Sequence, residues 1–204
     1  TKSIPKESSI PFINTIRTNS IDTHKSLESI MNDIKSETYK DNKTGKTRDK
    51  KNLPAFIPCV YLPTYKALDR NSYYCSTGII QFDIDDLSKD QAIEIREKVS
   101  KIKECLYVFL SPSENIKIGI RTDFHQNDTR HLKDEFKQAY SLVKKYLTEC
   151  LEQNIEFDDS CSSISQNCYV SYDPEMYFNP KAETFSVKEK AIRLRIDYER
   201  NSQE

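Results

Sequence analysis

Residues 78–87, which read GIIQFDIDDL, decide the fold. Apolar and polar side chains alternate along this segment, so it is predicted to be a strand with one buried face and one face that carries Asp83 and Asp85. Ser88 follows directly, and Gln91 comes three residues after it, which is the capping-box pattern at the start of a helix. A strand that leads straight into a capped helix therefore forms the centre of the predicted fold.

Strand-like and helix-like patterns of apolar residues continue downstream. Alternating or continuous apolar residues predict further strands at residues 105–110, 116–121 and 168–172. Apolar residues spaced three and four apart predict a helix around residues 92–102 and a longer one around residues 132–147, which Asp128 or Thr129 would cap. The resulting order, β-α-β-β-α-β, predicts an α+β fold that resembles a ferredoxin-like or RNA-recognition-motif-like palm.

The upstream third of the chain has weaker patterns. Apolar residues at helical spacing predict a helix over residues 27–34, with Asp22 or Thr23 as its N-cap. Residues 40–52 (KDNKTGKTRDKKN) hold six lysines and arginines and are expected to form an exposed loop, either simply solvated or in contact with DNA. Residues 53–65 are apolar but contain three prolines, which allows only an edge strand or an extended crossing segment.

The composition excludes several classes of protein. The 204 residues include 31 Lys and Arg against 32 Asp and Glu, and a formal charge of −1 excludes a polybasic nucleic-acid coat, although a local basic groove is compatible with it. Only 3 glycines are present, where average usage would give roughly 14. Phosphate-binding loops that need several glycines, such as G-x-G-x-x-G and G-x-x-x-x-G-K-[ST], are therefore excluded.

Cysteine usage and the ends of the chain indicate its setting. The sequence has neither a signal-peptide core nor an apolar run long enough to span a bilayer, so we expect a cytoplasmic protein without membrane contact. Its 6 cysteines are expected to be free thiols. There is no C-x-x-C pair, and Cys161 and Cys168 are too isolated to predict a zinc knuckle. Because the first residue is Thr1 rather than Met, the chain is expected to be part of a longer one.

Asp83 and Asp85 are the sharpest chemical signal. Two residues apart on a strand, they share a face, with Cα atoms about 6–7 Å apart. Carboxylates so placed can converge on Mg²⁺ or Mn²⁺. Two such ions would activate an attacking 3′-oxygen and stabilise a leaving pyrophosphate. An exposed strand end with two unrelated acids is the alternative, and D-x-D is also typical of nucleotide-sugar glycosyltransferases, so the motif does not select a reaction by itself.

Two further blocks accompany this pair. Residues 111–117 (SPSENIK) place hydroxyl groups on a tight turn before Lys117 and could hold a triphosphate. Lys117 would share a strand face with Arg121, with Gly119 between them leaving room for close approach. An ordinary Ser-Pro turn before a strand is the alternative. Further on, an acid after Phe157 could complete a carboxylate triad, with Asp158 as first choice and Asp159 as the alternative. An acidic loop is the competing interpretation of that third block.

In their order and spacing, the blocks resemble archaeo-eukaryotic-type primase-polymerases. More narrowly, they are similar to the primase-like N-terminal domain of virulence-associated-protein-E-type replication proteins of mobile elements. The resemblance covers roughly residues 25–185 and rests on these segments: residues 51–55 (KNLPA), 76–85 (STGIIQFDID), 111–117, His131 with Phe136, 171–174 (SYDP) and 179–180.

This resemblance implies both a fold and an activity. Residues 1–187 would form a primase-polymerase-like domain, a palm packed with a second small α/β unit, and residues 188–204 a charged tail towards a helicase-type domain. The activity would be template-directed nucleotidyl transfer from NTPs or dNTPs on single-stranded DNA, in replication of a mobile element or phage, with a helicase in the same polypeptide or operon. Site residues would be Asp83, Asp85 and Asp158 for Mg²⁺ or Mn²⁺, and Ser111, Ser113, Lys117 and Arg121 for the nucleotide.

Two departures from the family pattern keep other functions open. The family turn usually reads Ser-Pro-Ser-Gly-x-Gly-x-Lys, whereas here Glu114 replaces the first glycine and the second is missing. An arginine commonly precedes the Cys-Tyr-Val-Ser strand, where this chain has Gln166 and Asn167, so a bidentate phosphate clamp is lost. The alternatives are a catalytically weakened palm that binds DNA or a replication partner, and another metal-dependent nucleotidyl or glycosyl transferase that uses D-x-D.

Overall fold

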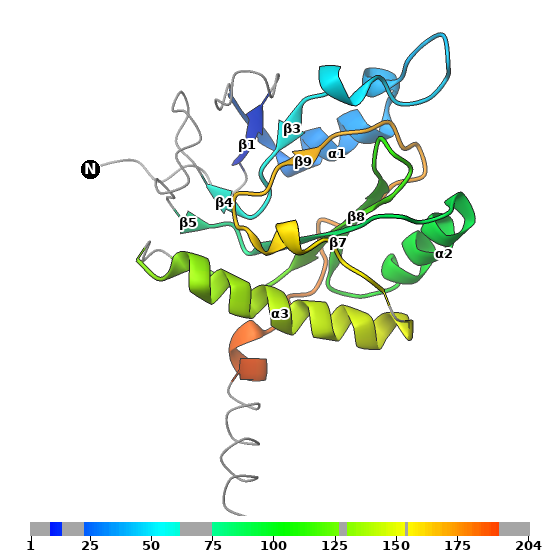
Figure 1. Cartoon of the computed structure of the whole chain (residues 1–204). Helices are drawn as coiled ribbons and strands as arrows, with labels where there is room; N and C mark the ends of the chain where they lie inside the picture. The colour runs from blue at the N-terminus through cyan, green and yellow to red at the C-terminus, as the bar shows by residue number, and fades with distance from the viewer. Residues whose placement is uncertain (1–8, 14–22, 62–74, 127–129, 154, 192–204) are drawn as a thin grey trace, which may run out of the picture.

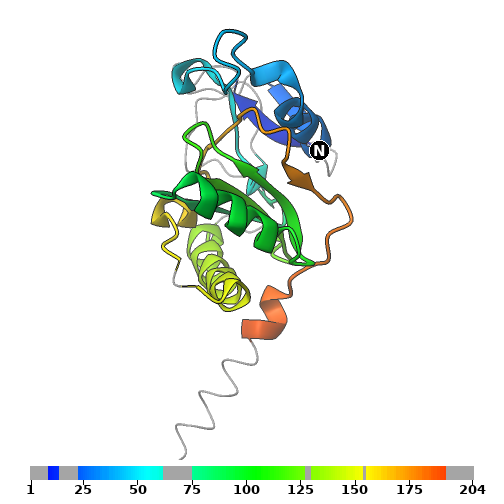
Figure 2. The ribbon, with the colours of Figure 1, turned by 90° about the vertical axis from the view of Figure 1, so that its right-hand side faces the viewer.

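The computed structural model describes residues 9–13, 23–61, 75–126, 130–153 and 155–191. A central sheet lies between two coverings, a pair of helices on one face and a smaller sheet with its own helix on the other (Figure 1). Figure 2, turned by 90°, shows these layers from the side. The α+β class predicted from the sequence is confirmed.

The central sheet has the order β10-β7-β8-β6 in the described part of the chain, and all its neighbouring strands are antiparallel. Its strands are β6 (Ile79–Ile84), β7 (Cys105–Leu110), β8 (Ile116–Arg121) and β10 (Tyr177–Phe178). Because β6 and β7 both run antiparallel to β8, they are parallel to each other, and α2 (Lys89–Val99) makes the crossover between them. The predicted β-α-β-β order is therefore present, with β8 inserted between the two parallel strands.

Helices α2 and α3 (Leu132–Leu151) cover one face of this sheet. Ile80, Phe82 and Ile84 of β6 lie on that face and pack against the stripes of both helices, as the alternating pattern predicts, whereas Ile79 belongs to the core on the other face. The capping box of Ser88 and Gln91 is present, so the predicted start of α2 is confirmed. The N-cap of α3 is His131, whereas the predicted caps Asp128 and Thr129 lie outside the described residues.

The second sheet, of order β2-β1-β3-β9, and helix α1 cover the other face. These elements are β1 (Ser9–Ile13), β2 (Thr23–Ser26), α1 (Leu27–Lys35), β3 (Ala55–Phe56) and β9 (Cys168–Tyr169). The described short elements are β4 (Val60–Tyr61), which pairs with β5 (Cys75–Ser76), and the 3₁₀ turns η2 (Glu37–Tyr39), η3 (Lys50–Asn52) and η4 (Asp159–Ser162).

Three details differ from the sequence-based expectations. The N-cap of α1 is Ser26, whose side chain accepts from the Ser29 amide; of the predicted caps, Thr23 lies in β2 and Asp22 lies outside the described residues. The strand expected at residues 168–172 contains only two residues, and it pairs with β3 in the second sheet. Residues 53–65, expected to form an edge strand or an extended crossing segment, form the short strands β3 and β4 as far as they are described. β4 is an edge strand beside β5, but β3 lies between β1 and β9 and is internal, which is possible because Pro54 and Pro58 flank its two residues and do not interrupt its pairing.

The C-terminal end of the described chain, the helix lengths and the cysteines are the remaining features of the fold. Residues 187–191 are helical, and the rest of the expected charged tail, residues 192–204, lies outside the described residues. Within the described part of the chain, none of the helices has the length and apolar character that a membrane crossing requires. Each of the six cysteines is a free thiol.

Candidate functional site

A buried ion pair lies on the face of the central sheet that looks towards the second sheet. Asp83 on β6 and Lys117 on β8 are directly opposite each other in the strand register, and the Lys117 ammonium donates to Asp83 Oδ2. Only 13% of the Asp83 side chain and 8% of the Lys117 side chain are exposed. The other carboxylate oxygen, Asp83 Oδ1, is buried and has no hydrogen-bond partner among the described residues.

Asp158 reaches the same place from the segment that follows α3. Phe157 is buried and packs edge-on against Phe82, with ring centroids 5.4 Å apart, and this contact anchors the segment on β6. The Asp158 amide then donates to the Asp83 carbonyl at 2.9 Å. The Asp158 carboxylate caps η4 and accepts from the amide and hydroxyl of Ser160, at 2.8 and 2.6 Å. The hydrophobic-Asp pattern thus places Asp158 beside Asp83.

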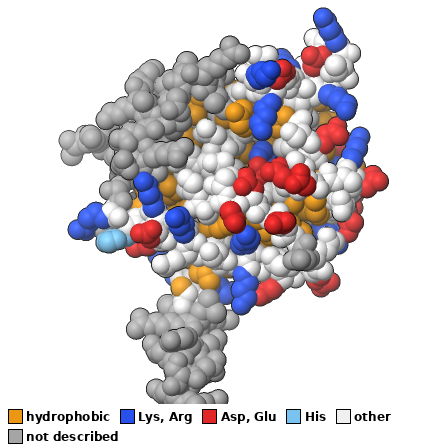
Figure 3. All heavy atoms as spheres, viewed as in Figure 1, with side chains coloured by type: hydrophobic (Ala, Val, Ile, Leu, Met, Phe, Trp, Pro, Cys, Tyr) orange, Lys and Arg blue, Asp and Glu red, His pale blue; other side chains and the backbone are white. Residues whose placement is uncertain are grey.

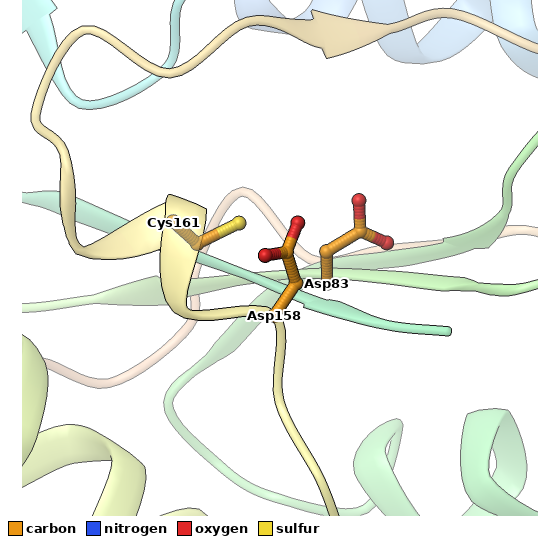
Figure 4. Close-up of side chains that lie close together, drawn as sticks. All are labelled: Asp83, Asp158 and Cys161. Atoms are coloured by element: carbon orange, nitrogen blue, oxygen red, sulfur yellow. The ribbon is translucent and has the colours of Figure 1, made fainter. Parts of the chain in front are cut away.

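Cys161 completes a cluster of three possible ligands. It follows Asp158 by three residues, a spacing that puts both side chains on one side of the 3₁₀ turn η4. One carboxylate oxygen each from Asp83 and Asp158 and the Cys161 Sγ all lie within 4.8 Å of one another. In Figure 4 the two carboxylates stand side by side, with the thiol next to Asp158. These three residues are called the Asp-Asp-Cys cluster below.

The structure separates the two acids that the sequence left as alternatives. Asp159 is 87% exposed and accepts from the Lys144 ammonium at 2.9 Å, so it lies outside the Asp-Asp-Cys cluster, whereas Asp158 belongs to it. Asp85 also lies outside the cluster. It follows the end of β6, is exposed, and accepts from the Asn115 side-chain amide at 2.8 Å. The three predicted metal acids therefore form one close pair and one exposed neighbour.

Burial and charge shape the protonation of this site. Burial raises the pKa of Asp83; the Lys117 ammonium opposes this shift, and the charges of Asp85 and Asp158 add to it. Burial opposes a charge on Lys117, yet the negative charges around it outweigh burial and raise its pKa. The neighbouring Cys168 thiol has a pKa far above its usual range and carries no charge at neutral pH. Asp83 is therefore the neighbour whose negative charge raises the pKa of Lys117. Burial raises the pKa of the Cys161 thiol to about 12.

The turn at residues 111–115 has a defined structure, but its side chains are not part of the Asp-Asp-Cys cluster. The Ser111 hydroxyl accepts from the amides of Ser113 and Asn115, at 3.2 and 3.1 Å, so it serves the turn itself. Glu114 has φ +63°, the left-handed conformation that favours glycine, at the position where the resembled family has glycine. Its carboxylate pairs with Lys46 at 3.3 Å.

A groove of about 520 Å³ runs beside this turn. Ser111, Ser113 and Glu114 line one side of it, and Lys46 and Lys89 are its exposed cations; neither Lys117 nor the Asp-Asp-Cys cluster lines it. On the face shown in Figure 3, acidic side chains gather over the middle of the molecule, with lysine and arginine side chains above them.

Arg121 and Gly119 do not form, together with Lys117, the nucleotide-binding face that the sequence predicts. The Arg121 guanidinium donates to the carbonyls of Pro180 and Ala182, at 2.8 and 3.0 Å, at the opposite end of β8 from Asp83. The space above Gly119 is filled by the ring of Tyr107, since a Cβ there would lie 2.2 Å from that ring. Gly119 therefore admits a core aromatic residue, not an approaching nucleotide.

Two residues of the site were not found from the sequence, Cys161 and Gln81. The Gln81 side chain is 1% exposed, and its amide donates to the Cys161 Sγ at 3.8 Å, while its Oε1 has no partner among the described residues. A polar residue in mid-strand was the one available signal for Gln81. For Cys161 there was none, because its role depends on η4 folding back onto β6.

Asp173, in the 171–174 motif, has a structural role. It is buried and accepts two hydrogen bonds from Arg96, at 2.9 and 3.1 Å, and one from the Leu110 amide at 2.8 Å. The motif therefore ties α2 to the end of β7 at the edge of the groove.

Comparison with known protein families gives a match over most of the described chain. Residues 48–178 match the model of the family described as BT4734-like, N-terminal domain. The chain belongs to the BT4734-like family. The matched range contains β3 to β10 and the whole Asp-Asp-Cys cluster, so this family's N-terminal domain includes the central sheet and its polar face. No curated protein and no solved structure matches the chain.

Proposed function

We propose that this domain is a metal-dependent nucleotidyltransferase of the DNA primase-polymerase type, acting in replication of a mobile element or phage. One observation carries the proposal. Asp83 and Asp158, far apart in the sequence, present carboxylate oxygens within 4.8 Å on a sheet face that is partly open, with Asp85 two residues beyond. This arrangement suits hard divalent ions such as Mg²⁺ or Mn²⁺, which take oxygen ligands and leave positions for phosphates.

In this mechanism Asp83 and Asp158 would hold one ion between them and Asp85 would contribute to a second. Bound there, the ions would lower the pKa of an attacking 3′-hydroxyl and neutralise the leaving pyrophosphate. Lys117 keeps Asp83 paired before an ion arrives, and Asp83 Oδ1 is the oxygen left over for the ion. Asn115 orients Asp85 by its hydrogen bond.

The groove beside residues 111–115 supports a nucleotide and template role. Lys46 and Lys89 supply positive charge there, and the exposed basic residues of the segment 40–52 continue it. We propose an NTP or dNTP in the groove, a single-stranded DNA template along the basic segment, and a helicase as partner in the cytoplasm. The crossover from β6 to β7 around β8 supports the finer assignment to an RNA-recognition-like palm.

A second candidate function is favoured by the state of the acids. Asp83 is already paired with Lys117, Asp85 with Asn115, and Glu114 places a carboxylate in the groove where a triphosphate would bind. A palm with these contacts could bind DNA or a replication partner and catalyse weakly or not at all.

Primer synthesis and primer extension on single-stranded DNA, with Mg²⁺ or Mn²⁺, test the proposal. The wild type should give product, and Asp83→Ala/Asp85→Ala should not, while Asp90→Ala, which removes an exposed acid in the first turn of α2, should leave the product unchanged. Absence of product from wild type with every metal, while DNA binding is retained, would favour the second candidate. Turnover of a labelled nucleotide sugar would favour the D-x-D transferase instead.

A further inference from the structure

The Asp-Asp-Cys cluster contains a donor that a site for Mg²⁺ alone does not need. Cys161 is 1% exposed, and its Sγ lies within 4.8 Å of both carboxylates. Thiolate sulfur is a poor ligand for Mg²⁺ but a good one for Zn²⁺ and other thiophilic ions. In a tetrahedral site with metal–oxygen bonds of about 2.1 Å the donors stand about 3.4 Å apart, so modest side-chain rotations would bring this set together.

Two buried oxygens at the cluster have no hydrogen-bond partner among the residues that the structure describes. Asp83 Oδ1 is one, and Gln81 Oε1 is the other, on an amide whose nitrogen already contacts the Cys161 Sγ. An amide in that position can stabilise a thiolate through its N–H and accept from a metal-bound water through its oxygen. Without a metal-bound water, this buried amide oxygen has no hydrogen-bond partner among the described residues.

The charges of the buried site point in the same direction. With the Cys161 thiol protonated, a divalent ion between Asp83 and Asp158 would leave a net positive charge, because Lys117 is buried beside them. An ion that displaces the thiol proton to solvent makes three negative donors, which the ion and the Lys117 ammonium balance to zero. A neutral buried site is the less costly one.

We propose that Asp83, Asp158 and Cys161 bind one thiophilic divalent ion of the Zn²⁺ class, with a water molecule as fourth ligand and Gln81 supporting the thiolate and the water. Asp85 lies outside this set and remains for a hard ion that arrives with the nucleotide. The inference refines the ion-binding step of the proposed function, on which its catalytic relevance rests. Its test uses neither nucleotide nor template, so that the two can fail separately.

Titration of the metal-free protein with Cd²⁺ and Zn²⁺ tests the inference. The first equivalent of Cd²⁺ should give a thiolate-to-metal charge-transfer band that Cys161→Ser removes and Cys168→Ser, a buried thiol outside the cluster, retains. Gln81→Leu should weaken Zn²⁺ binding about 10–100-fold. Circular dichroism checks that each variant is folded.

A wild-type measurement keeps the inference testable if Cys161→Ser does not fold. Calorimetric titration with Zn²⁺ in buffers of different ionisation enthalpy should show release of about one proton per ion, as expected for a thiol that becomes a ligand. Titration with Mg²⁺ should show no thiol proton. A Cd²⁺ band that survives in folded Cys161→Ser, or Zn²⁺ binding without proton release, would overturn the inference even if wild type incorporates nucleotides.

Discussion

Lys117→Met should destabilise the domain strongly, because it leaves Asp83 without its cation in the space between the two sheets. Both side chains are largely buried, and breaking a buried ion pair by removing one partner costs about 3–5 kcal/mol. Against a typical free energy of unfolding of about 5–15 kcal/mol this is a large fraction. For a domain of this length it corresponds to a fall in Tm of about 6–20 °C.

Urea and thermal unfolding followed by circular dichroism measure this change, since the chain contains no tryptophan for fluorescence. Lys98→Met is the matched control. It breaks the exposed pair of Lys98 with Glu94 on α2 and should cost less than about 1 kcal/mol. The double variant Asp83→Leu/Lys117→Met should recover most of the lost stability, because no unpaired buried charge remains. A loss for Lys117→Met as small as that of Lys98→Met would refute the buried-pair reasoning.

Three further predictions follow from single contacts. Gly119→Ala should lower stability by about 1–3 kcal/mol or more, measured by urea unfolding, because the new Cβ overlaps the Tyr107 ring; an unchanged midpoint would contradict this. Ser88→Ala should cost about 1 kcal/mol in the same assay by removing the cap of α2, and Ser100→Ala, at the other end of the helix, should cost less. Burial raises the pKa of Asp83, so the folded state holds its proton to a higher pH than an unfolded chain does, and an ion must displace that proton below the raised pKa. The rise in Tm on adding Mn²⁺ should therefore be larger at pH 8 than at pH 5.5, and an equal or reversed effect in a thermal scan would contradict it.

The elements around residue 83 were predictable because their signals are local. Alternation along β6 assigned Asp83 to the opposite face from Phe82, and the capping box gave the start of α2. Phe157 before an acid correctly indicated which aspartate reaches β6, because a buried ring anchors the segment. Periods of two and about three and a half residues report which side of an element is buried, and that information is in the sequence.

The rest of the site depends on distances that periodicity does not contain. Lys117 and Arg121 share a strand face as expected, yet four residues of strand separate them by about 13 Å, so only Lys117 meets Asp83. The sequence predicts room for a ligand at Gly119, but the neighbouring strand fills that space with the Tyr107 ring. Cys161 became part of the site only through the folding of η4 against β6, a contact between segments far apart in the chain.

Metal-dependent nucleotide incorporation by Asp158→Asn and Asp159→Asn tests the central claim most directly. The two acids are adjacent in the chain, but only Asp158 belongs to the cluster with Asp83, while Asp159 pairs with Lys144 at the surface. Incorporation on a primed single-stranded template should fall about 100-fold or more in Asp158→Asn and stay within about twofold of wild type in Asp159→Asn. Equal activity of the two folded variants, or a larger loss in Asp159→Asn, would contradict the assignment of Asp83 and Asp158 as the metal-binding pair of a nucleotidyltransferase.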